Sequence, residues 1–407
     1  MRNLHRLLVA AALIALAPSA FADVITDWNE KAVAFVTGKM APAAAQRIVT
    51  IMHLAMFDAV NSIEPRYRPY LAALPAATGT SKEAAAASAA GTVLASLNPQ
   101  AEELRSAMAA YLATIPDSEA KAQGIKLGEA VATKILEARA NDGADATDSY
   151  RPKTRPGVYV GTAPFVSTTW AKLKPFALTS QSQFRPEPPI ALSSEQWAAD
   201  YNEIKDLGAK DSSKRSIKQT EDGRFWLITG PQSGDPIVRQ VAMAKRMSVI
   251  DCARFMALVA VAAADAGIAV FDAKYTYEFW RPVTAIRNGD IDDNPATERD
   301  AIWQPLDSTP MHPEYPCAHC TISGALAAAV EAALGNAEIP EVSMTSPTAP
   351  GVIHRWTNIQ AYNEEVSYAR IWAGFHYRFS VRVGQDVGRK VGRYVVETVM
   401  QPAVAAR

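Results

Sequence analysis

The longest apolar stretch of the chain, DPIVRQVAMAKRMSVIDCARFMALVAVAAADAGIAVFD at residues 235–272, decides the fold. Alanine, valine and other apolar residues follow one another there with few polar interruptions, which is typical of a helix buried on all sides. A transmembrane helix is also apolar, but Asp265 interrupts this stretch. We therefore expect a central core helix and not a membrane span.

Helical periodicity dominates the rest of the chain as well. Residues 42–63 place Ile48, Met52 and Ala55 at helical spacing, behind a proline that suits the first turn of a helix. Strand signals are scarce, and there is no internal repeat of fixed period. The predicted fold class is therefore all-α, a helical bundle. Further helices are expected at residues 81–97, 99–115, 118–141, 193–207 and 214–228.

The chain divides into four predicted segments. Residues 1–22 are expected to form a signal peptide, and residues 23–142 an N-terminal helical region. Residues 143–234 hold connecting helices and an irregular excursion, which should be ordered because it carries several large aromatic residues. Residues 235–400 form a second helical bundle, into which the candidate catalytic residues are crowded.

The N-terminus has the organisation of a secretory signal. Arg2 and Arg6 precede a short apolar run, and residues 20–22 have the small-x-small pattern of a cleavage site. The apolar run is too short to cross about 30 Å of hydrocarbon. We therefore expect cleavage after Ala22 and a secreted or periplasmic protein.

The charge balance and the missing motifs exclude several classes of protein. The chain has 41 Lys and Arg residues against 42 Asp and Glu residues and no basic stripe, so no nucleic-acid partner is expected. It has no phosphate-binding glycine loop, no zinc-protease motif and no serine-hydrolase elbow. Three cysteines cannot form a disulfide framework, although the spacing of Cys317 and Cys320 permits a structural or regulatory pair.

The first of three motifs is KYTYEFWRP at residues 274–282. On a regular helix, Lys274 and Arg281 are seven positions apart, so they lie on one face and can point at one anion. Pro282 then marks the end of the helix or a turn. A lysine and an arginine at this spacing are more often solvated surface residues, so the motif alone carries little weight.

The second motif is MHPEYPCAH at residues 311–319, which runs into an alanine-rich stretch. Pro316 followed by small residues predicts a helix start, whose free N–H groups and positive dipole end would lie near His319. This combination could cradle an oxyanion beside a proton donor. A capped helix with an incidental histidine explains the same residues equally well.

The third motif is RIWAGFHYR at residues 370–378. Arg370 and His376 are six positions apart and would point to different faces of a regular helix. They converge only if Gly374 breaks the helix or if a turn intervenes. Taken singly, this motif is also weak evidence for a functional site.

Together and in this order, the three motifs resemble those of the phosphatidic acid phosphatase type 2 and vanadium-dependent haloperoxidase superfamily, over residues 235–396. Residues 51–63 also look like the entry helix of the bacterial haloperoxidase-like members. The resemblance implies a helical bundle that binds phosphate, or vanadate as a cofactor in its place.

The resemblance also implies roles for individual residues. His376 would attack phosphorus or act as the apical vanadium ligand, and His319 would be the acid/base on the opposite face. Three fixed cations suit an oxyanion that becomes trigonal-bipyramidal. The oxyanion-binding residues so implied are Lys274, Arg281, Cys317, Ala318 and Arg370.

The chain departs from the family pattern at four positions. Cys317 replaces a hydroxyl donor by a weaker S–H donor, and Ala318 replaces a glycine. Ala369 replaces a serine. Ser380 stands where the phosphatases carry an aspartate, so His376 is expected to lack its orienting carboxylate.

Two features favour the haloperoxidase branch: the length of the chain and its helical N-terminal half. His312 falls where related bromoperoxidases carry a histidine, and Trp280 could form the wall of a halide or substrate pocket. Ordinary packing explains both side chains about as well. His354, in the turn-rich stretch 350–356, is expected near the mouth of the site and has no assigned role.

The leading interpretation is an exported vanadium-dependent haloperoxidase-like enzyme that oxidises halide with hydrogen peroxide. One alternative is a periplasmic acid phosphatase that acts on phosphate monoesters through a phosphohistidine. Another is a catalytically impaired oxyanion-binding protein. The expected partners are small molecules, either halide and peroxide or a phosphate ester. The sequence leaves the oligomeric state undecided.

Overall fold

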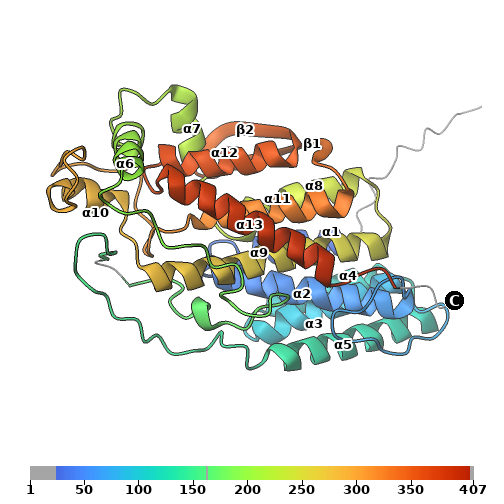
Figure 1. Cartoon of the computed structure of the whole chain (residues 1–407). Helices are drawn as coiled ribbons and strands as arrows, with labels where there is room; N and C mark the ends of the chain where they lie inside the picture. The colour runs from blue at the N-terminus through green and yellow to red at the C-terminus, as the bar shows by residue number, and fades with distance from the viewer. Residues whose placement is uncertain (1–23, 162–163, 404–407) are drawn as a thin grey trace, which may run out of the picture.

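The structure is a computed structural model that describes residues 24–161 and 164–403. Within these ranges it contains thirteen α-helices, three short 3-10 helices and one two-stranded sheet. The predicted all-α bundle is therefore confirmed, with the sheet as a small addition (Figure 1). The helices are α1 (Val24–Val36), α2 (Pro42–Ile63), α3 (Lys82–Leu97), α4 (Glu102–Ala113), α5 (Glu119–Arg139), η1 (Trp170–Lys172), α6 (Glu195–Leu207), α7 (Ile217–Phe225), η2 (Pro231–Ser233), α8 (Asp235–Ala244), α9 (Val249–Tyr277), α10 (Pro282–Arg287), η3 (Gly289–Ile291), α11 (Ala318–Leu334), α12 (Ile359–Trp372) and α13 (Arg378–Thr398).

The predicted helix ends agree with capping chemistry. Pro42 occupies the first turn of α2, and Ser81, Ser118 and Ser194 cap α3, α5 and α6 through their side-chain oxygens. Helix α1 was not predicted. The predicted signal peptide at residues 1–22 lies outside the described residues, and the four-segment division of the chain stays a prediction.

The core helix α9 is shorter than the apolar stretch that predicted it. Residues 235–272 do not form one helix: α8 and α9 are separated by a turn in which Arg246 has a φ of 48°, and Ser248 then caps α9. By length and composition α9 could cross a membrane. Its apolar window is, however, completely buried inside the bundle, as in the core helix of a globular protein.

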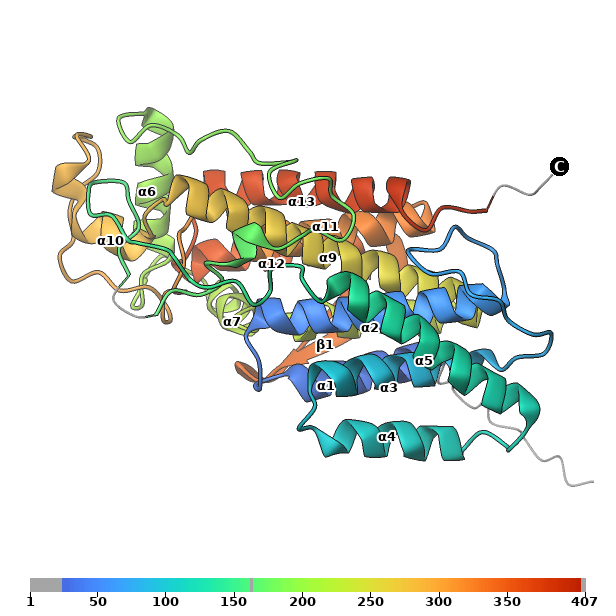
Figure 2. The ribbon, with the colours of Figure 1, turned by 90° about the horizontal axis from the view of Figure 1, so that it is seen from below.

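Helix α9 runs through the middle of the molecule. Helix α2 packs against it on one side, and α11 and α13 pack on the other (Figure 1). Helix α3 packs behind α2, and α4 is the outermost helix of this side (Figure 2). One hydrophobic cluster extends from Val24 to Met400, so the N-terminal helices and the C-terminal bundle share a core.

The irregular segment after α5 is fastened to α9 by a buried carboxylate. Asp265, the residue that interrupts the apolar stretch, is fully buried and accepts hydrogen bonds from the backbone N–H groups of Phe176, Ala177 and Leu178 at 2.7, 2.7 and 2.9 Å. Three donors satisfy a charge that would be costly to bury alone. Asp265 therefore orders the excursion.

A β-hairpin between α11 and α12 was not predicted. Strands β1 (Glu338–Ser346) and β2 (Ala349–Asn358) pair antiparallel, with Val342 opposite Trp356 and Met344 opposite His354. Prolines at positions 340, 347 and 350 hide the alternating pattern that predicts strands. The hairpin packs against α7, α8 and α12.

Helices α11 and α13 approach each other through glycines. A Cβ atom at Gly388 would lie 2.2 Å from the carbonyl oxygen of Thr321, and one at Gly392 would lie 2.3 Å from that of Ala325. Neither neighbour is a flexible side chain, so a larger residue would push the helices apart. This close contact sets the position of α11, whose N-terminus enters the site described below.

We expect Gly388→Ala to lower the free energy of unfolding by about 1–3 kcal/mol, because the added methyl group overpacks the α11–α13 contact. Gly267→Ala in α9 is the matched control, since a Cβ atom there meets nothing within 4 Å. That change should raise stability by up to about 1 kcal/mol through helix propensity. Urea unfolding measures both; equal effects would contradict the packing argument.

Candidate active site

Three cationic side chains are buried together at one end of α9. Lys274 lies in its last turn, Arg281 precedes α10, and Arg370 lies in the last turn of α12. Their exposed fractions are 0%, 1% and 2%. Burial lowers the pKa of all three, to about 10 for Arg281 and about 9 for Arg370, and mutual repulsion lowers those of Lys274 and Arg370 further. The three cations predicted from the motifs therefore meet at one site.

Lys274 and Arg281 converge for a different reason from the one predicted. They do not share a helix face, because α9 ends at Tyr277 and Glu278 adopts a left-handed conformation with φ of 50°. Pro282 does not end that helix but occupies the first turn of α10. The chain thus reverses between the two cations.

The cations are held mainly by neutral backbone carbonyls. Carbonyl groups orient the side chains but leave their positive charges uncompensated, and Arg370 Nε has no hydrogen-bond partner among the described residues. The acceptors are Pro313 O (2.8 Å) and Glu314 O (2.7 Å) for Lys274, His312 O (2.9 Å) and Phe375 O (3.0 Å) for Arg281, and Trp226 O for Arg370.

His376 joins the cations because the chain turns after α12. The helix ends at Trp372, Gly374 has a φ of 79°, and the N–H of His376 donates to Arg370 O at 3.3 Å. Of the two routes to convergence left open by the sequence, helix termination at the glycine is the one observed. His376 is 1% exposed.

The neighbours of His376 fix its tautomer. Arg281 can only donate, so its Nη1 donates to His376 Nε2 at 3.1 Å, and Nε2 carries the lone pair. His376 Nδ1 then donates to Glu314 Oε1 at 2.8 Å. Burial, followed by repulsion from Arg281, Lys274 and Arg370, holds the pKa of His376 well below its usual value. Nε2 is therefore the unprotonated nitrogen, and it could act as a nucleophile or as a ligand in place of its hydrogen bond from Arg281.

Glu314 is the site residue that sequence reasoning missed. The aspartate expected four residues after His376 is replaced by Ser380, but a carboxylate 62 positions earlier in the chain fills its place. Glu314 Oε1 also accepts the N–H of Tyr377 at 3.1 Å. The expectation that His376 lacks an orienting carboxylate is therefore wrong. The motif contained Glu314, but nothing in its spacing pointed to His376.

The N-terminus of α11 lies at the same site, with one change from expectation. Cys317 forms a disulfide with Cys320, so it has no S–H group to donate, and its backbone N–H donates to Ser380 O at 3.3 Å. Cys317 therefore does not provide the predicted side-chain donor for an oxyanion. Ala318 is the first residue of α11, where N–H groups have no partner within the helix.

His319 is neutral and points one nitrogen at a carbonyl. Its Nε2 donates to Ile228 O at 3.0 Å, which leaves Nδ1 as the nitrogen that can accept a proton. Burial first, and then Arg370, lowers the pKa of the imidazole well below its usual value. Arg281 and Lys274 act on the same ring, so His319 lies within the field of all three cations.

A cavity of about 310 Å³ reaches two histidines of the site, although none of the three cations lines it. His312 and His319 line it, and the rest of its wall is mostly apolar, with Phe271, Met311 and Leu326. Arg281 Nη2 donates to His312 Nδ1 at 3.0 Å, which connects the cavity to the cationic cluster. A small apolar molecule could therefore reach the two histidines.

Trp280 is placed differently from the prediction. It is 1% exposed, stacks on Trp197 at 6.0 Å between ring centroids, and belongs to an aromatic cluster with Tyr377. It is not among the residues that line the cavity. Its packing therefore does not support the predicted role as a pocket wall, whereas His312 does line the cavity.

The charges define the kind of ligand that the site fits. Three buried cations face one buried carboxylate, and the histidines are neutral, so the cluster carries excess positive charge. Such a site fits a small oxyanion, with guanidinium forks, an ammonium group and helix N–H groups as donors. Lys274, Arg281 and Arg370 are the residues that could hold it.

The fold and the site define an all-α protein with a buried cluster of three cations, and comparisons with known proteins place it further. The family models of the vanadium chloroperoxidase N-terminal domain and second helical-bundle domain match residues 21–161 and 254–404. The chain belongs to the vanadium haloperoxidase superfamily. A vanadium chloroperoxidase of Curvularia inaequalis is 31% identical over 197 residues, which cover 40% of this chain and 31% of that protein. The chain thus spans about a third of that relative's length.

Solved structures share the fold. A bacterial vanadium-dependent iodoperoxidase superimposes with a TM-score of 0.77 at 23% identity, over 94% of this chain and 97% of that one. The apo form of a bacterial vanadium-dependent chloroperoxidase gives a TM-score of 0.72 at 19% identity, over 89% and 94%. The arrangement of helices in this chain is therefore that of the bacterial haloperoxidases.

We expect Glu314→Gln to flatten the pH dependence of stability. Burial raises the pKa of Glu314 to about 7, against the opposing effects of Lys274 and Arg281. The folded-state pKa lies above the unfolded value of 4.5, so the folded protein holds the proton more tightly, and the free energy of unfolding falls as the pH rises through this window. The shift corresponds to roughly 3 kcal/mol.

Urea unfolding at about pH 5 and about pH 7.5 checks this expectation, since the window lies between these values. The amide of glutamine can still accept the hydrogen bond from His376 Nδ1, so the variant should fold. The wild-type protein should lose stability over this range by more than the variant does. If both lose the same amount, Glu314 does not titrate as described.

Proposed function

We propose that the protein binds vanadate at Lys274, Arg281 and Arg370 and oxidises a halide ion with hydrogen peroxide. The observation that carries this proposal is the buried cluster of three cations around the lone pair of His376 Nε2. Membership of the vanadium haloperoxidase superfamily supports vanadate over other oxyanions. The net reaction consumes halide, peroxide and a proton, and yields hypohalous acid and water.

Each residue has a part in this chemistry. The three cations bind and orient the anion, and they offset negative charge that develops on its oxygens. His376 offers Nε2 as the ligand, with Glu314 holding the proton on Nδ1. His319 Nδ1 is free to take a proton from peroxide and to return it to the leaving oxygen. Bound vanadate supplies Lewis-acid activation of peroxide toward the halide.

The apolar cavity supports a small organic molecule as the final acceptor of the oxidised halogen. Its wall holds Phe271, Met311 and Leu326, and it reaches His312 and His319. Aromatic and aliphatic walls of this size bind apolar compounds in preference to phosphate sugars or other charged esters. We therefore place substrate entry on the side of His312.

Export to an oxidising compartment is part of the proposal. It rests on the signal-like pattern of the first 22 residues. The Cys317–Cys320 disulfide supports it, since disulfides persist mainly outside the cytosol. Mass spectrometry of the protein from a periplasmic extract should find Asp23 as the N-terminal residue. A chain that still begins at Met1 would contradict the proposed export.

We expect orthovanadate to raise the melting temperature of the purified chain in phosphate-free buffer. A ligand at about 100 times its Kd stabilises the folded state by roughly 2.7 kcal/mol. Lys274→Met should weaken vanadate binding by about 10- to 100-fold, because it removes a charge-assisted hydrogen bond. Lys39→Met is the matched control: this exposed lysine pairs with the exposed Glu103 of α4, away from the cluster, and its loss should leave binding unchanged.

Activity assays then separate the proposal from its alternatives. Bromination of a phenol dye should require both vanadate and hydrogen peroxide, and His376→Ala should abolish it. Hydrolysis of a phosphate monoester that vanadate inhibits would instead identify a phosphatase, which uses the same cations and His376 as nucleophile. Vanadate binding without either activity would leave an oxyanion-binding protein and overturn the proposed function.

A further inference from the structure

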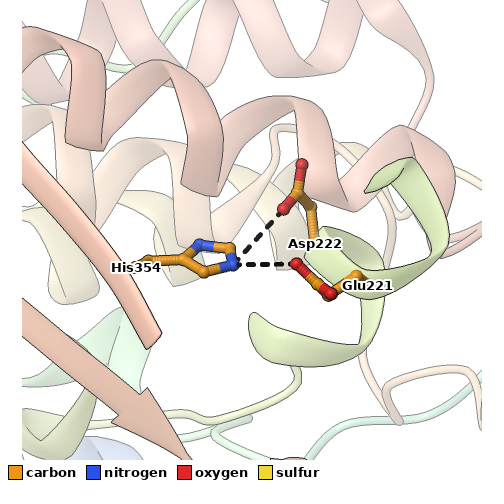
Figure 3. A group of neighbouring side chains, drawn as sticks. All are labelled: Glu221, Asp222 and His354. Atoms are coloured by element: carbon orange, nitrogen blue, oxygen red, sulfur yellow. Dashed lines mark ion pairs between the residues drawn. The ribbon is translucent and has the colours of Figure 1, made fainter. Parts of the chain in front are cut away.

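A second cluster of ionisable side chains lies outside the oxyanion site. It joins Glu221 and Asp222 of α7 to His354 of β2 (Figure 3). Glu365 of α12 contacts the same histidine. His354 is 6% exposed and Asp222 is 3% exposed, so both are buried, whereas Glu221 and Glu365 are partly exposed. The sequence had left His354 without a role, near the mouth of the site.

The neighbours of His354 fix which of its nitrogens carries a proton. Its Nδ1 makes a very short contact with Glu365 Oε1, so this nitrogen is the donor. Glu365 also accepts from the indole nitrogens of Trp226 at 2.9 Å and Trp356 at 3.2 Å, which holds the carboxylate in place. Phe225 stacks on the imidazole at 4.0 Å and 4°, which fixes the plane of the ring. A carboxylate behind one nitrogen commonly orients a histidine whose other nitrogen binds a metal.

The second nitrogen of His354 faces two carboxylates without a hydrogen bond. Nε2 is buried and has no hydrogen-bond partner among the described residues. It lies 3.6 Å from both Glu221 Oε1 and Asp222 Oδ1, as the dashed lines in Figure 3 show. This separation is too long for a hydrogen bond. It is close to the distance of about 3.3 Å between two ligands of one tetrahedral ion with bonds of about 2.0 Å.

We propose that Glu221, Asp222 and His354 bind a divalent transition-metal ion, with zinc as the best match. One imidazole nitrogen and two carboxylate oxygens, all within 4.8 Å of one another, form a ligand set of zinc type. The imidazole disfavours calcium and magnesium, which take oxygen ligands. Three protein ligands leave the fourth position to water, and Glu221 opens to a surface pocket that it lines with Thr220 and Thr348.

The metal site lies on the segment that supports the oxyanion site. One residue past α7, Trp226 O accepts the hydrogen bond of Arg370, and Ile228 O accepts that of His319. Glu365 lies five positions before Arg370 on α12. A metal ion that joins α7 to β2 would therefore stabilise the carbonyls that orient Arg370 and His319.

One native contact competes with the metal. Lys218 Nζ lies against Asp222 Oδ1, and this lysine side chain is 64% exposed. A bound cation has to displace the ammonium group from the same carboxylate. Removing the lysine should therefore strengthen metal binding, whereas removing a ligand should weaken it. These opposite signs separate a metal site from a generally sensitive region of the fold.

Zinc binding to the full chain, stripped with a chelator and kept free of vanadate, tests the proposal. Isothermal titration with Zn²⁺ alone should find one site per chain, and Mg²⁺ should not compete. Glu221→Gln should weaken binding by about 10-fold or more, and His354→Gln should weaken it further. Lys218→Met should tighten it several-fold. Glu341→Gln, which removes an exposed carboxylate paired with Arg355 on the same hairpin, should leave it unchanged.

The outcomes decide the proposal whether or not the enzymatic function stands, because the readout is zinc affinity and not turnover. Equal zinc affinity in wild type, Glu221→Gln and Lys218→Met would overturn it. The absence of zinc binding to the wild-type chain would overturn it as well. If His354→Gln fails to fold, Glu221→Gln and Lys218→Met still test zinc binding, because both side chains are at least partly exposed.

Discussion

The structure depends on the burial of three positive charges around one carboxylate. Lys274, Arg281 and Arg370 are withdrawn from water, and within residues 24–161 and 164–403 Glu314 is the one acid that lies among them. Burying a charge without a partner is strongly unfavourable. Burial accordingly lowers the pKa values of the three cations, and mutual repulsion lowers those of Lys274 and Arg370 further. A bound anion would offset this cost, so under the proposed function anion binding and stability would be coupled.

The rest of the fold keeps backbone carbonyls directed at these cations. The carbonyls come from the loop before α11, from the turn after α12 and from the residue after α7. None of these segments is held by a helix of its own. The glycine contact between α11 and α13 fixes the first, and Glu365, through Trp226 and His354, fixes the last. Packing remote from the three cations thus sets the geometry of the carbonyls around them.

The sequence was sufficient for the helices and for the identity of the cations, but not for the contacts between them. A proline marked the start of α2, and the predicted starts of α3, α5 and α6 lie within one residue of their serine caps, because capping is local chemistry. The partnership of Glu314 with His376 spans 62 positions and depends on how loops cross, which no periodicity encodes. The place of Trp280 in an aromatic cluster was equally invisible. The hairpin was missed because its prolines mask the alternation of its strands.

The net charge of the chain could not reveal the cationic site, because some buried acids bind backbone N–H groups and do not pair with the cations. The chain balances 41 basic against 42 acidic residues, and Asp265 and Asp58 are two of its fully buried acids. Each accepts three backbone N–H groups, Asp58 from residues 70, 71 and 72. These carboxylates order loops and are not counterions. Asp58 and Asp265 are thus committed to the backbone, and under the proposed function the cations at the end of α9 would keep their charge for an external anion.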